Sequence, residues 1–194
     1  MTVHGAARDQ VAQILKYRKL VVHGDVGQAF MYAAKGGDVY VLGNAAGRPL
    51  INAVGRPRVV INGTCLDYLA ESFMAGDPYN GGGFIVVNGL NPSFDGSFLE
   101  QEHPYPGSNL FSLASGGAIF IQDPYGKVSS EQLNGGRLAE ITLKDWELIL
   151  SFLEENEGLF GISVTGDLLT VRGKPLNPSQ VYRRIEPTPM QELT

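Results

Sequence analysis

The side chains that could carry out acid–base chemistry gather in one loop of this sequence. Glu102 and His103 are neighbours within residues 90–110, a segment that also holds three aromatic residues and a Pro-Tyr-Pro-Gly sequence. Histidine and carboxylate groups are the usual agents of proton transfer, so this pair is the first candidate for a catalytic site. Three other loop carboxylates are weaker candidates for acid–base catalysis, because carboxylates in loops are normally solvated or ion-paired. These carboxylates are Glu71, Asp95 and Glu100.

Motifs for other kinds of chemistry are missing from the sequence. The three histidines are far apart along the sequence, and Cys65 is the single cysteine, so neither a zinc nor an iron–sulfur site is predicted. Residues 43–48 are glycine-rich but contain no Gly-Lys-Ser/Thr triplet, and we expect a corner of the chain there. There is no Gly-x-Ser-x-Gly or Gly-x-Gly-x-x-Gly motif. Cys65 is expected to fill a small space in the core, and no cofactor or metal is expected in this chain.

The segments that must position these residues are strands that recur along the chain. An apolar alternation ends in glycine four times and in Asp123 the fifth time, and the last two intervals are longer than the first two. Aliphatic residues lie two and four positions before each end, which predicts strands with one fully buried face and a second, less buried face. The five segments are residues 20–24, 39–43, 59–63, 85–89 and 119–123.

Glycines mark the corners between the predicted strands. Only glycine allows positive φ angles and close backbone approach without steric cost, so we assign these glycines structural roles. The strand-ending glycines are Gly24, Gly43, Gly63 and Gly89. The glycine pairs that precede strands are Gly36-Gly37, Gly82-Gly83, Gly116-Gly117 and Gly135-Gly136.

A repeat of about twenty residues predicts stacked coils, and the sequence therefore favours an all-β-dominated, parallel β-helix. An antiparallel sandwich is the alternative, although its turns would recur more often. Three parts are expected: an N-terminal cap helix in residues 1–19, over residues 8–17; the coils in residues 20–141; and a helical or irregular tail, residues 142–194, that packs on the last coil. Thr142 begins an apolar helical stripe in this tail.

The composition limits the classes of partner. Of the 194 residues, 43% are hydrophobic and 18% are charged, as in a globular domain. The formal charge of −5 argues against nucleic acid as a partner. No apolar run is long enough to span a bilayer, and no signal peptide is recognisable, so we expect a cytoplasmic protein that does not contact a membrane.

The glycine phrases resemble a known family. Residues 24–28 and 36–48 resemble the repeated phrase of the GXGXG domain, and residues 69–76 with 82–90 look like a later coil of stand-alone versions. This domain is the right-handed parallel β-helix at the C-terminal end of the glutamate synthase large subunit. The C subunit of formylmethanofuran dehydrogenase is similar too. The resemblance covers residues 20–141, with weaker similarity in the tail to about residue 187.

The resemblance implies a right-handed coil and a role as a rigid spacer, with no catalytic residue to carry over. It implies a scaffold subunit of a glutamate-synthase-like complex, in which a glutaminase-like subunit hydrolyses the amide and another subunit holds FMN and iron–sulfur clusters. Two alternatives remain open. One is an independent enzyme or ligand-binding protein with a site at the 90–110 loop, and the other is a self-assembling structural homo-oligomer.

Overall fold

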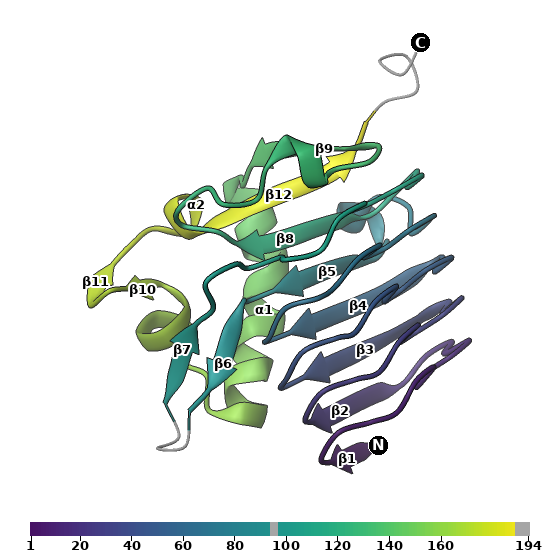
Figure 1. The fold of residues 1–194 in the computed structure, drawn as a ribbon, viewed down its shortest axis with the longest axis horizontal. Coiled ribbons are helices and arrows are strands. Elements are labelled where there is room, and N and C mark those ends of the chain that lie inside the picture. Colours follow the sequence, from purple (N-terminus) through teal and green to yellow (C-terminus); the bar gives the residue numbers. More distant parts are fainter. Residues whose placement is uncertain (94–96, 189–194) are drawn as a thin grey trace.

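An eight-stranded, mostly parallel sheet is the centre of this computed structural model, which describes residues 1–93 and 97–188. The chain connections cover one face of the sheet, and helix α1 (Leu143–Phe160) runs across the other (Figure 1). The strands lie in the order β1 (Thr2–His4), β2 (Lys19–His23), β3 (Gly36–Val41), β4 (Arg56–Ile61), β5 (Phe84–Val87), β8 (Ala118–Gln122), β12 (Tyr182–Pro187) and β9 (Gly136–Glu140). Strands β1, β2, β3, β4, β5 and β8 pair in parallel, whereas β12 is antiparallel to both β8 and β9.

The smaller elements lie outside this sheet. Two hairpins are formed by β6 (Leu90–Pro92) with β7 (Phe98–Glu100), and by β10 (Thr170–Val171) with β11 (Lys174–Pro175). The remaining helical segments are short, and their bounds are Pro78–Asn80, Ser130–Gln132, Val164–Leu168 and, for α2, Pro178–Val181.

The connections between the parallel strands stack on one another as the strands do. Ala7, Val26, Ala45 and Cys65 form a column of parallel bridges. Further along each connection, alternate non-glycine residues have positive φ angles, as at Met31 with 56°. These angles are unfavourable for such residues, but hydrogen bonds between neighbouring connections offset the cost. The Met31 N–H donates to the Val11 carbonyl at 2.9 Å, for example.

The main hydrophobic core lies between the sheet and the connections. The repeat places equivalent side chains above one another, so that Val22 of β2 lies beside Val41 of β3. Both are fully buried, as are the aliphatic residues predicted for this face of the next strands. They include Val39, Val59, Ile61, Ile85, Val87, Ile119 and Ile121.

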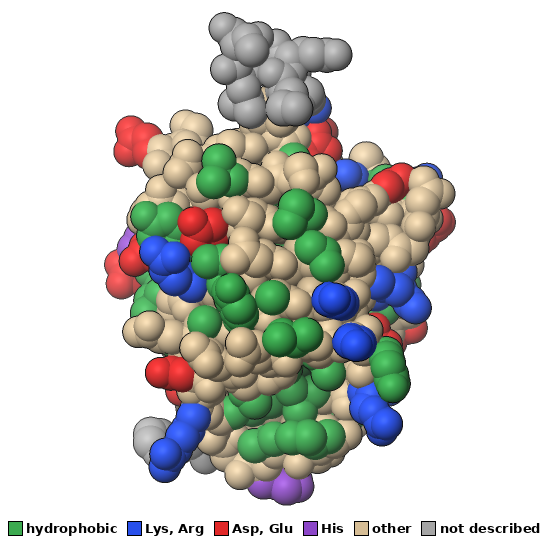
Figure 2. Space-filling view, turned by 90° about the vertical axis from the view of Figure 1, so that its right-hand side faces the viewer, with side chains coloured by type: hydrophobic (Ala, Val, Ile, Leu, Met, Phe, Trp, Pro, Cys, Tyr) green, Lys and Arg blue, Asp and Glu red, His purple; other side chains and the backbone are tan. Residues whose placement is uncertain are grey.

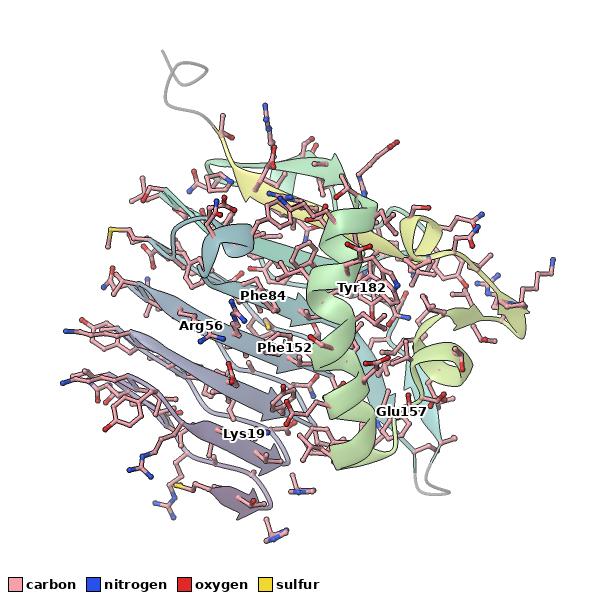
Figure 3. The ribbon with its side chains drawn as sticks, turned by 180° about the vertical axis from the view of Figure 1, so that it is seen from behind. Lys19, Arg56, Phe84, Phe152, Glu157 and Tyr182 are labelled. Atoms are coloured by element: carbon pink, nitrogen blue, oxygen red, sulfur yellow. The ribbon has the colours of Figure 1, made fainter. Side chains whose placement is uncertain are left out.

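The second face of the sheet is buried as well, contrary to the sequence prediction. Tyr40, Val60 and Val86 have no exposed surface, because Ile149 and Leu153 of α1 pack in the same cluster. Phe84 of the sheet and Phe152 of α1 point toward one another, and their rings meet edge to face at 5.0 Å (Figure 3). A face made of apolar side chains requires such a cover.

Buried amides fix α1 and β12 to the ends of the central strands. Asn62, directly after β4, and Asn156 of α1 each donate an amide hydrogen bond to the other at 2.8 Å. Asn88, directly after β5, donates to Asn62 at 2.9 Å and accepts from the Tyr182 hydroxyl of β12 at 2.8 Å. Because these groups are shielded from water, each depends on its partners in this cluster.

The expected all-β-dominated, right-handed parallel β-helix with helical end caps is wrong, since the protein has a mixed α/β fold. The 18-residue helix α1 forms a layer across the sheet instead of covering the last coil. Strand β12 enters antiparallel between β8 and β9, which interrupts the parallel stacking. The physical reason is the apolar second face, which gains more burial from a helical layer than an end cap would provide.

The expected cap helix over residues 8–17 is also wrong, because these residues form turns. They make up the first of the stacked connections, and β1 pairs with β2 in the main sheet. The predicted helix from Thr142 is confirmed: the Thr142 hydroxyl accepts the Asp145 N–H at 3.2 Å, and Gly161 ends the helix with a φ of 75°.

Two of the glycines occupy positions that other residues fit poorly. Gly24 lies so close to the preceding connection that a Cβ atom would be 2.6 Å from the carbonyl carbon of Gly5. Gly37 has a φ of 109°, which other residues seldom adopt.

We expect Val41→Asp to unfold or aggregate the protein, at a cost above about 4 kcal/mol, because it places an unpaired charge in the core. Leu143→Asp is the matched control, since Leu143 is 73% exposed in the first turn of α1. Thermal unfolding followed by circular dichroism measures both. Unchanged melting of a soluble Val41→Asp variant would contradict the burial described above.

Candidate functional site

The structure places His103 and Glu102 at the surface. Their side chains are 59% and 88% exposed, and the closest approach of His103 Nε2 to Glu102 Oε1 is 4.0 Å. Neither residue lines the clefts described below. Of the other carboxylates, Glu71 pairs with Arg48 at 3.3 Å, and Asp95 lies outside the described residues. The 90–110 loop therefore does not assemble an acid–base pair in a cavity.

Two shallow clefts lie between this loop and the stacked corners. One, of about 360 Å³, is lined by Asn44, Thr64, Cys65 and Gln101 among others, and a second, of about 450 Å³, is lined by His23, Asn44 and Asn91 among others. The polar groups at their centre bind one another. The Asn44 side-chain oxygen accepts from the Thr64 N–H and from the Gln101 amide, both at 2.9 Å. These bonds tie the loop to the corners.

Cys65 is fully buried in the column of small residues, next to Ala45. Burial raises the pKa of its thiol far above the ordinary value, so the thiol stays protonated near neutral pH. Because the thiolate is the reactive form, this cysteine acts as a small core residue, as the sequence predicted.

The largest of the described cavities, about 800 Å³, lies beside strands β9 and β12, next to the residues that precede β8. Its charged lining includes Arg137, Arg184 and Glu186. Arg137 Nε donates to Glu186 at 2.8 Å, and the two guanidinium groups share this carboxylate. The cavity therefore offers paired charges to a ligand, and a charged ligand would have to displace an existing partner.

Asp145 lies at the base of the same cluster with no exposed surface. Its Oδ1 accepts from the Tyr79 hydroxyl at 2.6 Å and from Arg184 Nη1 at 2.8 Å. Burial raises its pKa, but the hydrogen bonds from Thr142 and Tyr79 and the charge of Arg184 prevail, so the pKa lies below 3.8. Since the carboxylate caps α1 and binds β12, its role is structural.

The first connection leaves apolar side chains uncovered at the end of the stack. Val3, Ala7, Val11 and Leu15 are only partly buried. Their equivalents one repeat later are Val22, Val26, Phe30 and Ala34, all at most 2% exposed. These positions of β1 and the first connection are thus apolar, like the core positions of the next repeat, although nothing in the described part of the chain covers them. This open end, formed by β1 and the first connection, is the candidate functional site.

Positive charge surrounds the open end. Residues 1–19 contain four Lys and Arg and a single acidic residue, whereas residues 61–194 contain seven Lys and Arg against 17 Asp and Glu. Arg8, Lys16 and Arg18 are exposed. Figure 2 shows blue side chains down the right-hand half of the face where the strands begin, and a band of hydrophobic side chains at its lower end, where β1 lies. The open end thus combines apolar and basic groups.

This site is not predicted from the sequence, because residues 8–17 also fit the pattern of a short helix. The repeat carried the necessary signal, since Val3, Ala7 and Val11 precede Val22, Val26 and Phe30 by the same interval. Extended back to the first residues, the repeat therefore indicates the first connection and its open side.

Within residues 1–93 and 97–188, there is no group of three or more His, Cys, Asp or Glu side chains placed to hold a metal ion. No helix in the same part of the chain is both long and apolar enough to cross a membrane. Comparison of the chain with protein-family models, curated proteins and solved structures found no match.

We expect Asp145→Asn to destabilise the protein by about 3 kcal/mol at neutral pH, because it leaves Arg184 without its buried counter-charge. A carboxylate whose pKa is lowered in the folded state stabilises the fold above its unfolded pKa and loses this effect as the pH falls through the folded value. The loss caused by the substitution should therefore shrink below pH 3.8.

Urea unfolding of both proteins between neutral and acidic pH measures this effect. Glu147→Gln, at an exposed position of the same helix, is the matched control and should change little. A destabilisation by Asp145→Asn that is equal at all pH values would contradict the ion-pair explanation.

Proposed function

We propose that this chain is a scaffold subunit without catalytic activity of its own, which holds other protein subunits in register. The observation that carries the proposal is the open end, where Val3, Ala7, Val11 and Leu15 are apolar but incompletely covered. Covering each aliphatic side chain contributes about 1 kcal/mol or more, so a partner polypeptide gains stability by binding there.

The backbone supports the same proposal. Strand β1 pairs only with β2 among the described strands, so one of its edges has no neighbouring strand there. Natural proteins usually protect such edges by a cap or by a partner chain. Since the first connection consists of turns and no described helix covers it, a partner protein is the cover we propose.

The proposed partners come from the sequence resemblance to the glutamate synthase GXGXG domain. They are a glutaminase-like subunit and a subunit that holds FMN and iron–sulfur clusters, in a complex placed in the cytoplasm. Because the fold differs from the β-helix of that family, this part of the proposal rests on the glycine phrases alone. The single cysteine of this chain is too few to ligate an iron–sulfur cluster, so the clusters are assigned to a partner. FMN is assigned to the same partner by the resemblance alone.

We expect the protein, tagged at its C-terminus and purified from its native host, to carry a glutaminase-like or a flavin and iron–sulfur subunit with it. Mass spectrometry identifies the subunits, and a visible absorbance scan detects flavin. Val11→Gln should reduce recovery of the partner at least about fivefold without unfolding the protein, because it puts an amide into the apolar contact.

Leu143→Gln is the matched control, since it changes an exposed leucine far from the open end, and it should leave recovery unchanged. Purification of the wild-type protein alone, as a monomer or a homo-oligomer, would contradict the scaffold function. A purified protein that itself turns over a glutamine-dependent reaction would contradict it as well.

A further inference from the structure

The free edge of β1 has a length and composition that suit an added strand. Thr2, Val3 and His4 pair in parallel with Val21, Val22 and His23, and no described strand lies on their other side. A polypeptide that runs along β1 could form the hydrogen bonds that each inner strand of the sheet forms with two neighbours. The edge therefore favours an extended polypeptide over a globular surface.

The side chains beside this edge would contact both faces of such a polypeptide. Val3, Ala7, Val11 and Leu15 face the core side and are partly exposed. On the other face, Lys19 at the start of β2 is already paired with Glu155 of α1. Arg8, Lys16 and Arg18 are exposed on the first connection. A strand that alternates apolar and acidic residues complements this arrangement, since alternate side chains point to opposite faces.

Further cationic side chains lie beside the strands that follow the open end, β3 and β4. Lys35 precedes β3 and Arg56 begins β4, and both are exposed. Arg56 lies on the second face of the sheet, the one that α1 crosses, in a part that α1 leaves uncovered (Figure 3). Arg58, two residues further, stacks on Phe84 and Phe152, and burial followed by the charge of Arg56 lowers its pKa. An approaching acidic segment meets positive charge beyond the edge itself.

A second copy of the chain is a poor match for this end. Pairing β1 with β1 of another molecule would place the same basic residues opposite one another, which is unfavourable. The opposite edge strand, β9, contains one arginine and one glutamate and offers no excess of negative charge. Nucleic acid supplies negative charge but neither strand hydrogen bonds nor apolar side chains for Val3 and Val11.

We propose that the open end binds an extended, acidic segment of a partner protein, which adds a strand beside β1. This inference rests on the proposed scaffold function and specifies the chemistry of the partner at that site. The aliphatic residues and the free strand edge supply the binding energy, and Arg8, Lys16 and Arg18 select acidic partners.

The test uses two synthetic peptides of about ten residues, one alternating valine with glutamate and the other valine with lysine. Fluorescence anisotropy measures the binding of each labelled peptide to the full-length protein. The glutamate peptide should bind at least about tenfold more tightly than the lysine peptide, and its affinity should fall as salt is added. The triple variant R8E/K16E/R18E should lose at least about tenfold in affinity for it.

The matched control is the triple variant K127E/R172E/K174E, which changes the net charge equally at exposed positions away from the open end. It should bind the glutamate peptide as the wild type does. Equal binding of the two peptides, or equal loss in the two triple variants, would overturn the inference. So would tighter binding of a single-stranded DNA oligomer of similar length, or a dimer in sedimentation that the glutamate peptide cannot dissociate.

The two proposals fail in different ways. If the purification from the native host recovers partner subunits and neither peptide binds, the scaffold function stands and the acidic strand is wrong; the cations would then keep the edge free of other chains. If the peptide binds as expected but no subunit is recovered, the strand site stands and the glutamate-synthase-like complex is wrong.

Discussion

Backbone hydrogen bonding between successive connections is the constraint on which this structure depends. Each connection lies in register with the connection next to it in the stack. Its N–H and C=O groups must pair with those of that neighbour, because water is excluded between them. The Leu50 N–H, for example, donates to the Phe30 carbonyl at 2.7 Å. This pairing sustains positive φ angles at residues such as Leu50, and it leaves the first connection without a partner on one side within the described chain.

The sequence predicted the parts of the fold that depend on local pattern. The strands that end near Gly43 and Gly63 follow from period-two alternation, and the helix after Thr142 follows from its cap and stripe. The packing of α1 across the sheet could not be predicted, because the local sequence does not determine whether this helix covers the end of the stack or the face of the sheet. Its position depends on Asn156 meeting Asn62, which are 94 residues apart.

The candidate site shows the same limit. The sequence drew attention to His103 and Glu102 as chemically able residues, but their geometry leaves them exposed. The open end contains residues without special chemistry, such as Val3 and Ala7, and becomes visible only when burial is compared between equivalent positions. The ion pair of Asp145 with Arg184 is likewise beyond sequence pattern, because it joins segments whose proximity needs the tertiary fold.

The stacked connections also determine where this chain can grow. Inside a strand, one added residue would turn every following side chain to the opposite face, so length changes are restricted to corners or to a whole repeat. The two longer intervals, from Gly63 to Gly89 and from there to Asp123, fit this restriction. Their extra chain forms the turn Pro78–Asn80 and the β6–β7 hairpin outside the stack. New segments can therefore arise at the corners while the sheet and its two cores stay unchanged.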